Sequence, residues 1–460
     1  MDITNSYPLP DRASLSSAYV GKTLKDVPLP SAVLDLAKLK KNCALMLDTV
    51  KTLDVDFRAH VKTHKTAELA RYQVGGECKD VRLIGSTVAE LENLIPLMKD
   101  YQKAGARVNV LYGIPAGPSH AARLAGLLQS VGPGSLSLMI DNPRQLDTAT
   151  RVYELAGSLQ VRVFLKTDSG YHRAGLAPTS DRMQDLVRET LSFEAQGIVL
   201  LEGLYSHNSL SYGGNSPLDA MDNLRTEVDA CSQAALANTP NGYISSRDRP
   251  LSISCGASPT ALSLQNLLSN GSGTAATKSA DTLRASLAKA REAGIHFEIH
   301  AGVYPTFDMQ QVAASSRELG ERPEDNIALT VLTEICSTYP DRTETPEALV
   351  SVGTIALARE PCKSYRGHGV VAPWNMSAEY DPYSTQKRII VDRVSQEHGL
   401  LQWEDRGRKE ALPVEYGQRV RIWPNHACIT SSQYGWYLIV DSESEDKNVI
   451  RDVWVRWRGW

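Results

Sequence analysis

The sequence predicts an α/β protein in which a (β/α)8 barrel is followed by an antiparallel β domain. From residue 57 to residue 300, short β-rich runs alternate with helix-like stretches, a pattern that is typical of parallel strands. Eight such runs occur, and eight repeats over roughly 250 residues fit a closed barrel. After about residue 318 the chain changes to β-type runs with no long helical pattern between them. An open doubly wound sheet is the alternative for the first part.

The eight expected barrel strands are short runs rich in β-branched and apolar residues. They are residues 57–61, 81–84, 108–112, 136–141, 161–166, 199–206, 251–255 and 296–300. Helix-like segments, such as residues 89–105 and 182–197, lie between them. The segment 269–281 is small, polar and glycine-containing, and it reads as a flexible surface insertion between the seventh and eighth strands.

Domain boundaries follow from the same patterns. Residues 1–30 are an N-terminal segment that could join the β domain. Residues 31–312 are expected to form the barrel domain, with residues 29–42 adding a strand and a helix before the barrel proper. Residues 313–460 are expected to form the β domain, which carries a His-x-Cys pair.

Composition excludes several classes of protein. With 42% hydrophobic and 22% charged residues in 460, the chain is an ordinary globular protein. Its net charge of −4 argues against a nucleic-acid partner. No apolar run is long enough to cross a bilayer, and the N-terminus lacks a secretory pattern. The seven scattered cysteines indicate reduced thiols in a cytoplasmic protein.

Charged residues crowd the end of the first expected strand, in FRAHVKTHK at residues 57–65. Alternate strand residues face opposite sides, so Arg58, His60 and Lys62 would point into the barrel. Lys62 would then lie at the C-terminal end of the strand, where barrel active sites occur. A desolvated lysine at such a place can form a Schiff base; the alternative is a surface lysine in a polar loop. Lys65, farther along, is expected to be solvated.

Small and hydroxyl-bearing residues follow the last two barrel strands, in SCGASPT at residues 254–260 and HAGVY at residues 300–304. Backbone N–H groups in such loops can approach an anion closely, and barrels often bind phosphate there. The fifth and sixth strands also lead into polar residues, Lys166 and His207 among them. A Schiff-base lysine together with a phosphate-binding loop indicates pyridoxal phosphate (PLP).

A possible metal-binding pair occurs in WPNHACITS, residues 423–431. If this segment is a strand, His426 and Cys428 face the same side, and nitrogen plus sulfur favours zinc. Two protein ligands would leave positions open for water or substrate, as in a catalytic site. The alternative is two partly buried β residues without a metal. His398 is a possible neighbour, although a turn histidine is the simpler interpretation.

These motifs resemble those of the alanine-racemase-like PLP enzymes, and most closely the eukaryotic-type D-serine dehydratases of the D-threonine aldolase/D-serine dehydratase group. The resemblance covers most of the chain and includes RAHVKTHK, KTDSGYHRAG, GLYSHNSLSYG, SCGASPTAL, EIHAGVYPTFD, GTIALARE, EHG and PNHAC. RAHVKTHK has alanine where proline is usual, and proline there would only stiffen the strand end. Aldolase relatives tend to have aspartate in place of Cys428, so the cysteine favours a dehydratase.

The resemblance implies a role for each matching residue. Lys62 would form the Schiff base with PLP, and His207 would lie against the cofactor ring. Tyr205 and Tyr212 lie in the same loop and would touch PLP or substrate. His300 matches the place from which relatives address the pyridine nitrogen. The phosphate-loop positions are Gly256, Ala257, Ser258, Thr260, Gly302 and Val303.

The resemblance also implies zinc on His426 and Cys428, a small amino-acid substrate and a homodimer. The expected function is PLP- and zinc-dependent β-elimination of D-serine to pyruvate and ammonia, with D-threonine as a further candidate substrate. The alternatives are a metal-assisted D-threonine aldolase or a 3-hydroxyaspartate dehydratase. A more distant alternative is a non-catalytic PLP-binding protein. A racemase would have no use for the metal pair.

Overall fold

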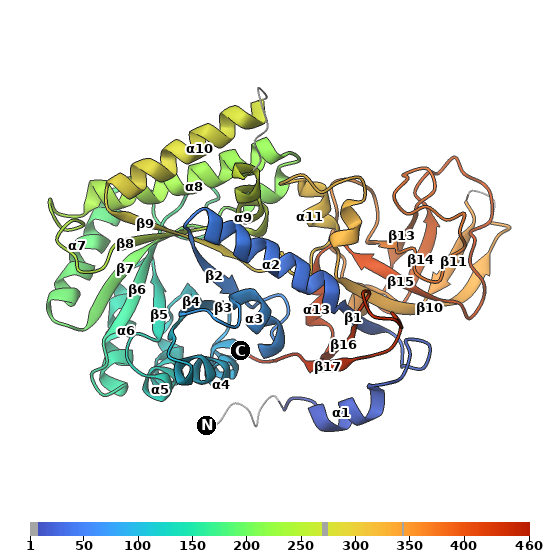
Figure 1. Ribbon diagram of the computed structural model, residues 1–460, viewed down its shortest axis with the longest axis horizontal. Helices are drawn as coiled ribbons and strands as arrows, with labels where there is room; N and C mark the ends of the chain where they lie inside the picture. The colour runs from blue at the N-terminus through green and yellow to red at the C-terminus, as the bar shows by residue number, and fades with distance from the viewer. Residues whose placement is uncertain (1–7, 269–274, 343–344) are drawn as a thin grey trace. The chain divides into compact units, whose positions relative to one another are not determined.

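The computed structural model describes residues 8–268, 275–342 and 345–460 (Figure 1). The chain folds into two compact units, which we call the barrel unit and the β unit. The barrel unit comprises residues 44–302, 314–318 and 459–460. The β unit comprises the described residues up to 43, together with 303–313 and 319–458.

Eight parallel strands form the closed barrel, in the order β2 to β9 (Figure 1). They are β2 (Asp56–His60), β3 (Asp80–Gly85), β4 (Arg107–Pro115), β5 (Leu136–Ile140), β6 (Val161–Lys166), β7 (Val199–Tyr205), β8 (Leu251–Cys255) and β9 (Ile295–Ala301). All eight expected strands are present. Because β9 pairs with β2, the sheet is closed and the open doubly wound alternative is wrong.

Helices surround the barrel strands (Figure 1). They are α3 (Ala67–Val74), α4 (Val88–Lys103), α5 (Ala121–Val131), α6 (Arg144–Leu155), α7 (Asp181–Ala195), α8 (Pro217–Asn238), α9 (Ser258–Ser263) and α10 (Ala275–Glu292), with 3-10 turns η2 (Pro118–His120), η3 (Ser209–Gly213) and η4 (Leu264–Leu267). Thr66, Thr87, Ser180 and Ser216 begin four of these helices, and each side chain accepts a backbone N–H of the first turn. Such caps explain where the helices start.

The expected flexible insertion at residues 269–281 is partly wrong. Residues 269–274 lie outside the described residues, but α10 begins at Ala275, so the remainder of the segment is helical. The reason is that Ala275–Glu292 is rich in alanine, lysine, arginine and leucine, whose high helix propensity outweighs the scattered small polar residues.

A charged network fills part of the barrel interior. Arg58 Nε lies 2.6 Å from Glu298 Oε1, and Arg58 Nη1 lies 2.7 Å from Asn109 Oδ1. Arg82 Nη1 lies 2.9 Å from Glu298 Oε2. Apolar side chains pack in the same interior: Ile84, Leu111, Met139, Phe164 and Tyr205. The inward direction predicted for Arg58 is therefore confirmed.

The β unit contains a nine-stranded sheet in the order β11-β14-β13-β12-β15-β10-β1-β16-β17. The strands are β1 (Ser31–Asp35), β10 (Leu329–Tyr339), β11 (Glu347–Val350), β12 (Gly369–Val371), β13 (Ile389–Val394), β14 (Gly399–Trp403), β15 (Arg419–Pro424), β16 (Trp436–Val440) and β17 (Asp452–Val455). Because β10 also pairs with β11, the strands from β11 to β10 close around an apolar core. The pairing is antiparallel except between β1 and β16.

The boundary expected at residue 31 differs from the strand pairing. β1 pairs with β10 and β16, so this strand belongs to the sheet of the β unit and not to the barrel. Helix α2 (Leu36–Thr52) then leads along the chain into the barrel unit. The N-terminal helix α1 (Arg12–Tyr19) also belongs to the β unit, where Arg12 Nη2 lies 3.0 Å from Asp452 Oδ2.

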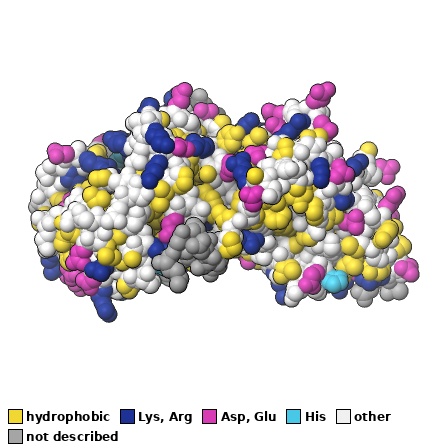
Figure 2. Space-filling model, turned by 90° about the horizontal axis from the view of Figure 1, so that it is seen from below, with side chains coloured by type: hydrophobic (Ala, Val, Ile, Leu, Met, Phe, Trp, Pro, Cys, Tyr) yellow, Lys and Arg dark blue, Asp and Glu magenta, His cyan; other side chains and the backbone are white. Residues whose placement is uncertain are grey.

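The remaining short helices connect these elements: α11 (Met309–Ala314), η5 (Pro323–Asn326), α12 (Thr354–Leu357) and α13 (Ala427–Ser432). Charged side chains of both signs are interspersed over the face drawn in Figure 2. Among the described residues, no helix has the length and apolar character needed to cross a membrane.

Candidate active site

Lys62 is half-buried and lies on the turn that follows β2. The strand ends at His60, one residue before the end that the sequence predicted. Two buried histidines brace this turn. His60 Nδ1 donates to the carbonyl of Ile84 at 3.0 Å. His64 Nε2 donates to Gln73 Oε1 at 2.9 Å. The lysine amine is therefore carried by a turn whose backbone is anchored on both sides.

The expectation that Lys65 is solvated is wrong. Its side chain is only 16% exposed, and Nζ lies 2.8 Å from the buried carboxylate of Glu90. The same carboxylate accepts the backbone N–H of Ser86 at 2.9 Å. The turn gives Lys65 a φ of +50°, and the packed environment that surrounds it could not be read from the local sequence. Sequence reasoning missed Glu90.

Tyr205, His207 and His300 form an aromatic cluster at the barrel mouth. Tyr205 and His300 stack with ring centroids 4.3 Å apart and planes 8° apart. The His207 ring lies 6.0 Å from His300. Burial lowers the pKa of His207 well below its usual value, and the positive charge of Lys62 lowers it further. The structure therefore brings the two histidines together, and burial lowers the pKa of both imidazoles.

The loop after β8 is held in an unusual backbone conformation. Gly256 has a φ of +145°, and a Cβ at this position would lie 2.3 Å from the carbonyl oxygen of His300, so only glycine fits. The Gly256 carbonyl accepts from His207 Nδ1 at 2.6 Å. The Gly256 N–H donates to Glu227 at 3.0 Å, and the Ala257 N–H donates to Thr260 Oγ1 at 2.8 Å. These two N–H groups thus already have protein acceptors.

The other expected cofactor residues lie on nearby elements of the chain. Tyr212 is half-buried in η3, which follows β7. Ser258 is buried at the start of α9. A Cβ on Gly302 would lie 3.2 Å from the carbonyl oxygen of His60, so this glycine permits a close approach. Val303 is buried, but it falls in the β unit.

Sequence reasoning missed Glu227, on α8. This carboxylate is fully buried, and it accepts the Gly256 N–H at 3.0 Å and the Thr260 hydroxyl at 3.3 Å. Burial raises the pKa of Glu227 to about 7, against the lowering effect of the Gly256 N–H and Lys166. One signal could have found it: Glu227 falls among the apolar positions, such as Leu224 and Val228, that form the buried face of α8.

Lys166 confirms its predicted inward direction. It is 5% exposed, and Nζ lies 5.3 Å from the centroid of the Tyr205 ring. Burial lowers its pKa.

The His300 side chain is also buried, and among the described residues its Nε2 has no hydrogen-bond partner. PLP is an aromatic aldehyde with a ring nitrogen. The half-buried Lys62, the neutral imidazoles of His207 and His300, and the unpaired Nε2 of His300 form a donor and acceptor set that fits it.

The expected strand geometry of the His-x-Cys pair is wrong. β15 ends at Pro424, His426 is the residue before α13, and Cys428 lies in the first turn of that helix. The reason lies in Asn425, whose Nδ2 donates to the carbonyls of Glu360 at 2.8 Å and Gly367 at 2.9 Å and so holds a turn at this point.

The His426 and Cys428 side chains are nevertheless adjacent. Burial by itself would lower the pKa of His426. The hydrogen bond to Cys428 and the negative charge of its thiolate outweigh this effect and raise the pKa of His426 to about 9. Glu360 Oε2 lies 3.3 Å from His426 Nδ1. The described residues contain no group of three or more His, Cys, Asp or Glu side chains arranged to hold a metal. The pair fits zinc in the type of its donors and would supply two ligands. His398 is exposed on the turn between β13 and β14.

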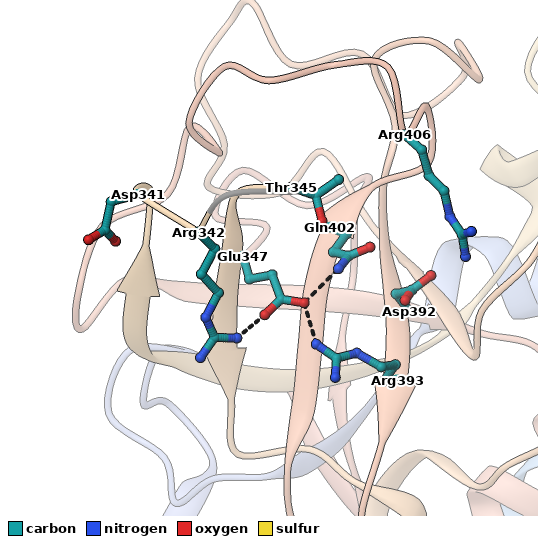
Figure 3. Close-up of a pocket in the computed structure, with 8 residues that line it drawn as sticks. All are labelled: Asp341, Arg342, Thr345, Glu347, Asp392, Arg393, Gln402 and Arg406. Atoms are coloured by element: carbon teal, nitrogen blue, oxygen red, sulfur yellow. Dashed lines mark hydrogen bonds and ion pairs between the residues drawn. The ribbon is translucent and has the colours of Figure 1, made fainter.

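A separate cavity of about 710 Å³ in the β unit contains none of the expected site residues (Figure 3). It is lined by Asp341, Arg342, Thr345, Glu347, Asp392, Arg393, Gln402 and Arg406. At its centre, Glu347 pairs with Arg342 and Arg393 and accepts from Gln402 at 2.6 Å (Figure 3). The lining as a whole carries three carboxylates and three guanidinium groups, so its formal charges balance.

Comparisons with known proteins agree with this architecture. Residues 328–440 match the putative serine dehydratase domain, and residues 34–272 match the alanine racemase N-terminal domain. The chain is 36% identical to a D-serine dehydratase of Schizosaccharomyces pombe, over 98% of this chain and 96% of that one. It is 31% identical to a D-serine dehydratase of Saccharomyces cerevisiae, over 96% and 99%.

A solved structure supports the fold. The structure of D-threo-3-hydroxyaspartate dehydratase from Delftia sp. HT23 superposes with a TM-score of 0.71 at 24% identity, covering 95% of this chain and all of the other. These matches cover nearly the entire chain, as expected if the relatives share both the barrel unit and the β unit. The chain therefore belongs to the D-serine dehydratase family, a family of lyases built on the PLP-dependent alanine-racemase-like fold.

Proposed function

We propose that this protein binds PLP and zinc and catalyses the elimination of water from D-serine, which yields pyruvate and ammonia. The observation that carries the proposal is the position of Lys62: it lies at the C-terminal end of the first barrel strand, and its charge acts on His60, His207 and His300. Barrel active sites occur at this end of the strands. The homology to D-serine dehydratases supports the substrate.

Each barrel residue has a task in this proposal. PLP, when bound, supplies an electron sink for the charge that forms at the substrate α-carbon. Lys62 would anchor the cofactor through its amine and would accept the α-proton at Nζ. His207, fixed by its bond to the Gly256 carbonyl, would support the cofactor ring. Tyr205 and Tyr212, and the loops at Gly256–Thr260 and Gly302, would orient cofactor and substrate.

His426 and Cys428 are the residues that would hold zinc. A hydroxyl is a poor leaving group, and a bound zinc ion would supply Lewis acidity toward it. The adjacent imidazole and thiol support this part of the proposal. The neighbouring Glu360, at 3.3 Å from His426 Nδ1, would orient the imidazole. The proposal includes the homodimer that the family resemblance implies. Sedimentation measurements of the oligomeric state test this part.

The central test is pyruvate release from D-serine, run beside L-serine. We expect pyruvate from the D-enantiomer alone, loss of activity after chelation, and recovery when zinc is returned. Glycine plus an aldehyde from D-threonine, with no pyruvate, would identify an aldolase instead. Oxaloacetate from 3-hydroxyaspartate, with no pyruvate from D-serine, would identify a hydroxyaspartate dehydratase.

Replacing Cys428 by alanine separates the metal from the cofactor. We expect Cys428→Ala to bind PLP as the wild type does but to lose zinc and at least about 10²-fold in elimination rate, since ligand loss removes the Lewis acid. Zinc content, cofactor absorbance and pyruvate release are measured on the same sample. Cys336→Ala, at another partly buried cysteine of the β unit, is the matched control. Undiminished elimination in Cys428→Ala would remove zinc from the mechanism.

A further inference from the structure

The inference concerns Asp308, a fully buried aspartate of the β unit that directly precedes α11. Its Oδ2 accepts the backbone N–H of Ala427 at 2.8 Å, and its Oδ1 accepts the backbone N–H of Gln311 at 2.9 Å. Ala427 is the residue between His426 and Cys428. One carboxylate oxygen therefore holds the backbone that joins the two expected zinc ligands.

Other hydrogen bonds hold the same segment. The backbone N–H of Gln310 donates to the carbonyl of Asn425 at 3.1 Å, so the start of α11 contacts the chain on both sides of His426. The carbonyl of His426 accepts the N–H of Thr430 at 3.1 Å and closes the first turn of α13. The backbone around His426 is thus fixed by several hydrogen bonds within the β unit.

Asp308 is also a buried carboxylate whose hydrogen-bond partners are neutral backbone groups. Among the described residues, no lysine or arginine forms an ion pair with it. Burial raises its pKa, and the positive charge of His426 opposes this rise. Buried charges in proteins are paired with an opposite charge or bound to a metal. A cation held by His426 and Cys428 would supply Asp308 with a counter-charge.

We propose that Asp308 is a positioning residue for a metal ion on His426 and Cys428. It fixes the Ala427 peptide so that the imidazole and the thiolate stay adjacent, and its negative charge favours a divalent cation there. This inference rests on the proposed function for the identity of the ion as zinc. Asp308 acts through the backbone of the ligands and through its charge, as do the hydrogen-bonded groups that orient ligands in other metal sites.

Zinc affinity tests the proposal independently of turnover. The full chain is stripped of metal, and its zinc dissociation constant is measured by competition with a chromophoric chelator. Asp308→Asn has no charge and one carbonyl oxygen for two N–H donors, and we expect it to bind zinc about 10-fold more weakly. Asp308→Ala removes both acceptor oxygens, and we expect binding to weaken about 100-fold.

Asp35→Ala is the matched control. Asp35 is another buried aspartate of the β unit, and its Oδ1 accepts the backbone N–H of Ser442 at 3.2 Å and the Ser442 hydroxyl at 3.0 Å. We expect this variant to lower the free energy of unfolding and to leave the zinc dissociation constant unchanged. If it weakens zinc binding as much as Asp308→Ala does, the effect is one of overall stability and the proposal is overturned.

Cobalt(II), which binds the same nitrogen and sulfur ligands as zinc, reports the position of the thiolate. A cobalt–thiolate bond gives a charge-transfer band in the difference spectrum, and Cys428→Ala should lack it. We expect Asp308→Ala to show a weaker band even at saturating cobalt, because the released peptide lets Cys428 turn away from the ion. A protein that is merely less stable recovers the full band at saturation, so a full band in Asp308→Ala would overturn the positioning role.

The wild type separates this inference from the proposed function. If the wild type binds zinc and Asp308→Ala binds it equally tightly, the inference is overturned and the proposed function stands. If the wild type binds no zinc, the metal part of the proposed function fails, and this inference fails with it. Should Asp308→Ala not fold, Asp308→Asn decides, and an unchanged zinc dissociation constant there contradicts the proposal.

Discussion

Lys62→Ala is expected to lower the rate of pyruvate formation by about 10⁴-fold or more, the upper end of what one positioned proton-transfer group contributes. The variant loses both the amine that would anchor PLP and the base that would take the α-proton. We also expect loss of the visible absorbance of covalently held cofactor. Borohydride reduction of the wild type followed by peptide mass mapping should place the cofactor on Lys62.

Lys62→Arg is the matched control for charge. Arginine keeps a positive charge at residue 62, but its guanidinium stays protonated and cannot act as an amine nucleophile. We expect the variant to fold and to be as inactive as Lys62→Ala. Substantial turnover in either variant, or a cofactor mapped to Lys166, would show that Lys62 has been assigned wrongly.

Glu227→Leu is expected to destabilise the protein and weaken its hold on PLP. The leucine leaves the Gly256 N–H without its acceptor in a buried site, at a cost of about 1–3 kcal/mol. The Thr260 hydroxyl can fall back on the Ala257 carbonyl, 3.1 Å away. The Gly256 carbonyl would lose its fixed position, and with it the support for His207. Denaturant unfolding and the PLP dissociation constant measure the two effects.

Comparing the stability of Glu227→Gln with that of the wild type over a range of pH should reveal how the Glu227 carboxyl group titrates. Burial raises the pKa of Glu227 to about 7, above the roughly 4.3 of an exposed glutamate. The favourable contribution of Glu227 to the free energy of unfolding is therefore complete at acidic pH, and it is lost as the pH rises through about 7. We expect the stability of the glutamine variant, relative to wild type, to rise by roughly 3 kcal/mol from pH 4 to pH 8, at about 1.4 kcal/mol per pKa unit.

Val228→Ala provides the control for both Glu227 variants. Val228 is the next residue on α8 and is fully buried, so its truncation disturbs the same helix without removing a polar contact. It should lower the free energy of unfolding by a similar amount at every pH and leave PLP affinity nearly unchanged. A pH-independent difference between Glu227→Gln and wild type would contradict the raised pKa.

The strands of both units could be predicted because their signal is local. Val161–Lys166 and Leu251–Cys255 are recognisable from composition and flanking turns alone, whatever lies across the sheet. Strand alternation also predicted that Arg58 and Lys166 point inward, and both are buried in the barrel. The helical start of α10 was misjudged because its first residues are small and polar, although the whole segment favours helix.

The expected cofactor residues came partly from strand ends and partly from the family resemblance. Local sequence could place Lys62, His207 and His300 at C-terminal strand ends, and closure of the barrel brings the charge of Lys62 within range of both imidazoles. It could not show that the N–H groups of Gly256 and Ala257 are already bonded within the protein. Those bonds depend on residues that no motif contains.

By itself, the sequence determined the eight-strand barrel, the β domain after it, and the lysine that follows the first barrel strand. Only the tertiary structure decided which buried carboxylate meets which donor: Glu90 with Lys65, Glu227 with Gly256, and Glu298 with Arg58. It also placed His426 and Cys428 at the start of a helix, where sequence alternation assumed a strand. The physical reason is distance along the chain. Strand periodicity is written in neighbouring residues, whereas a buried charge finds its partner only when closure and register bring remote segments together.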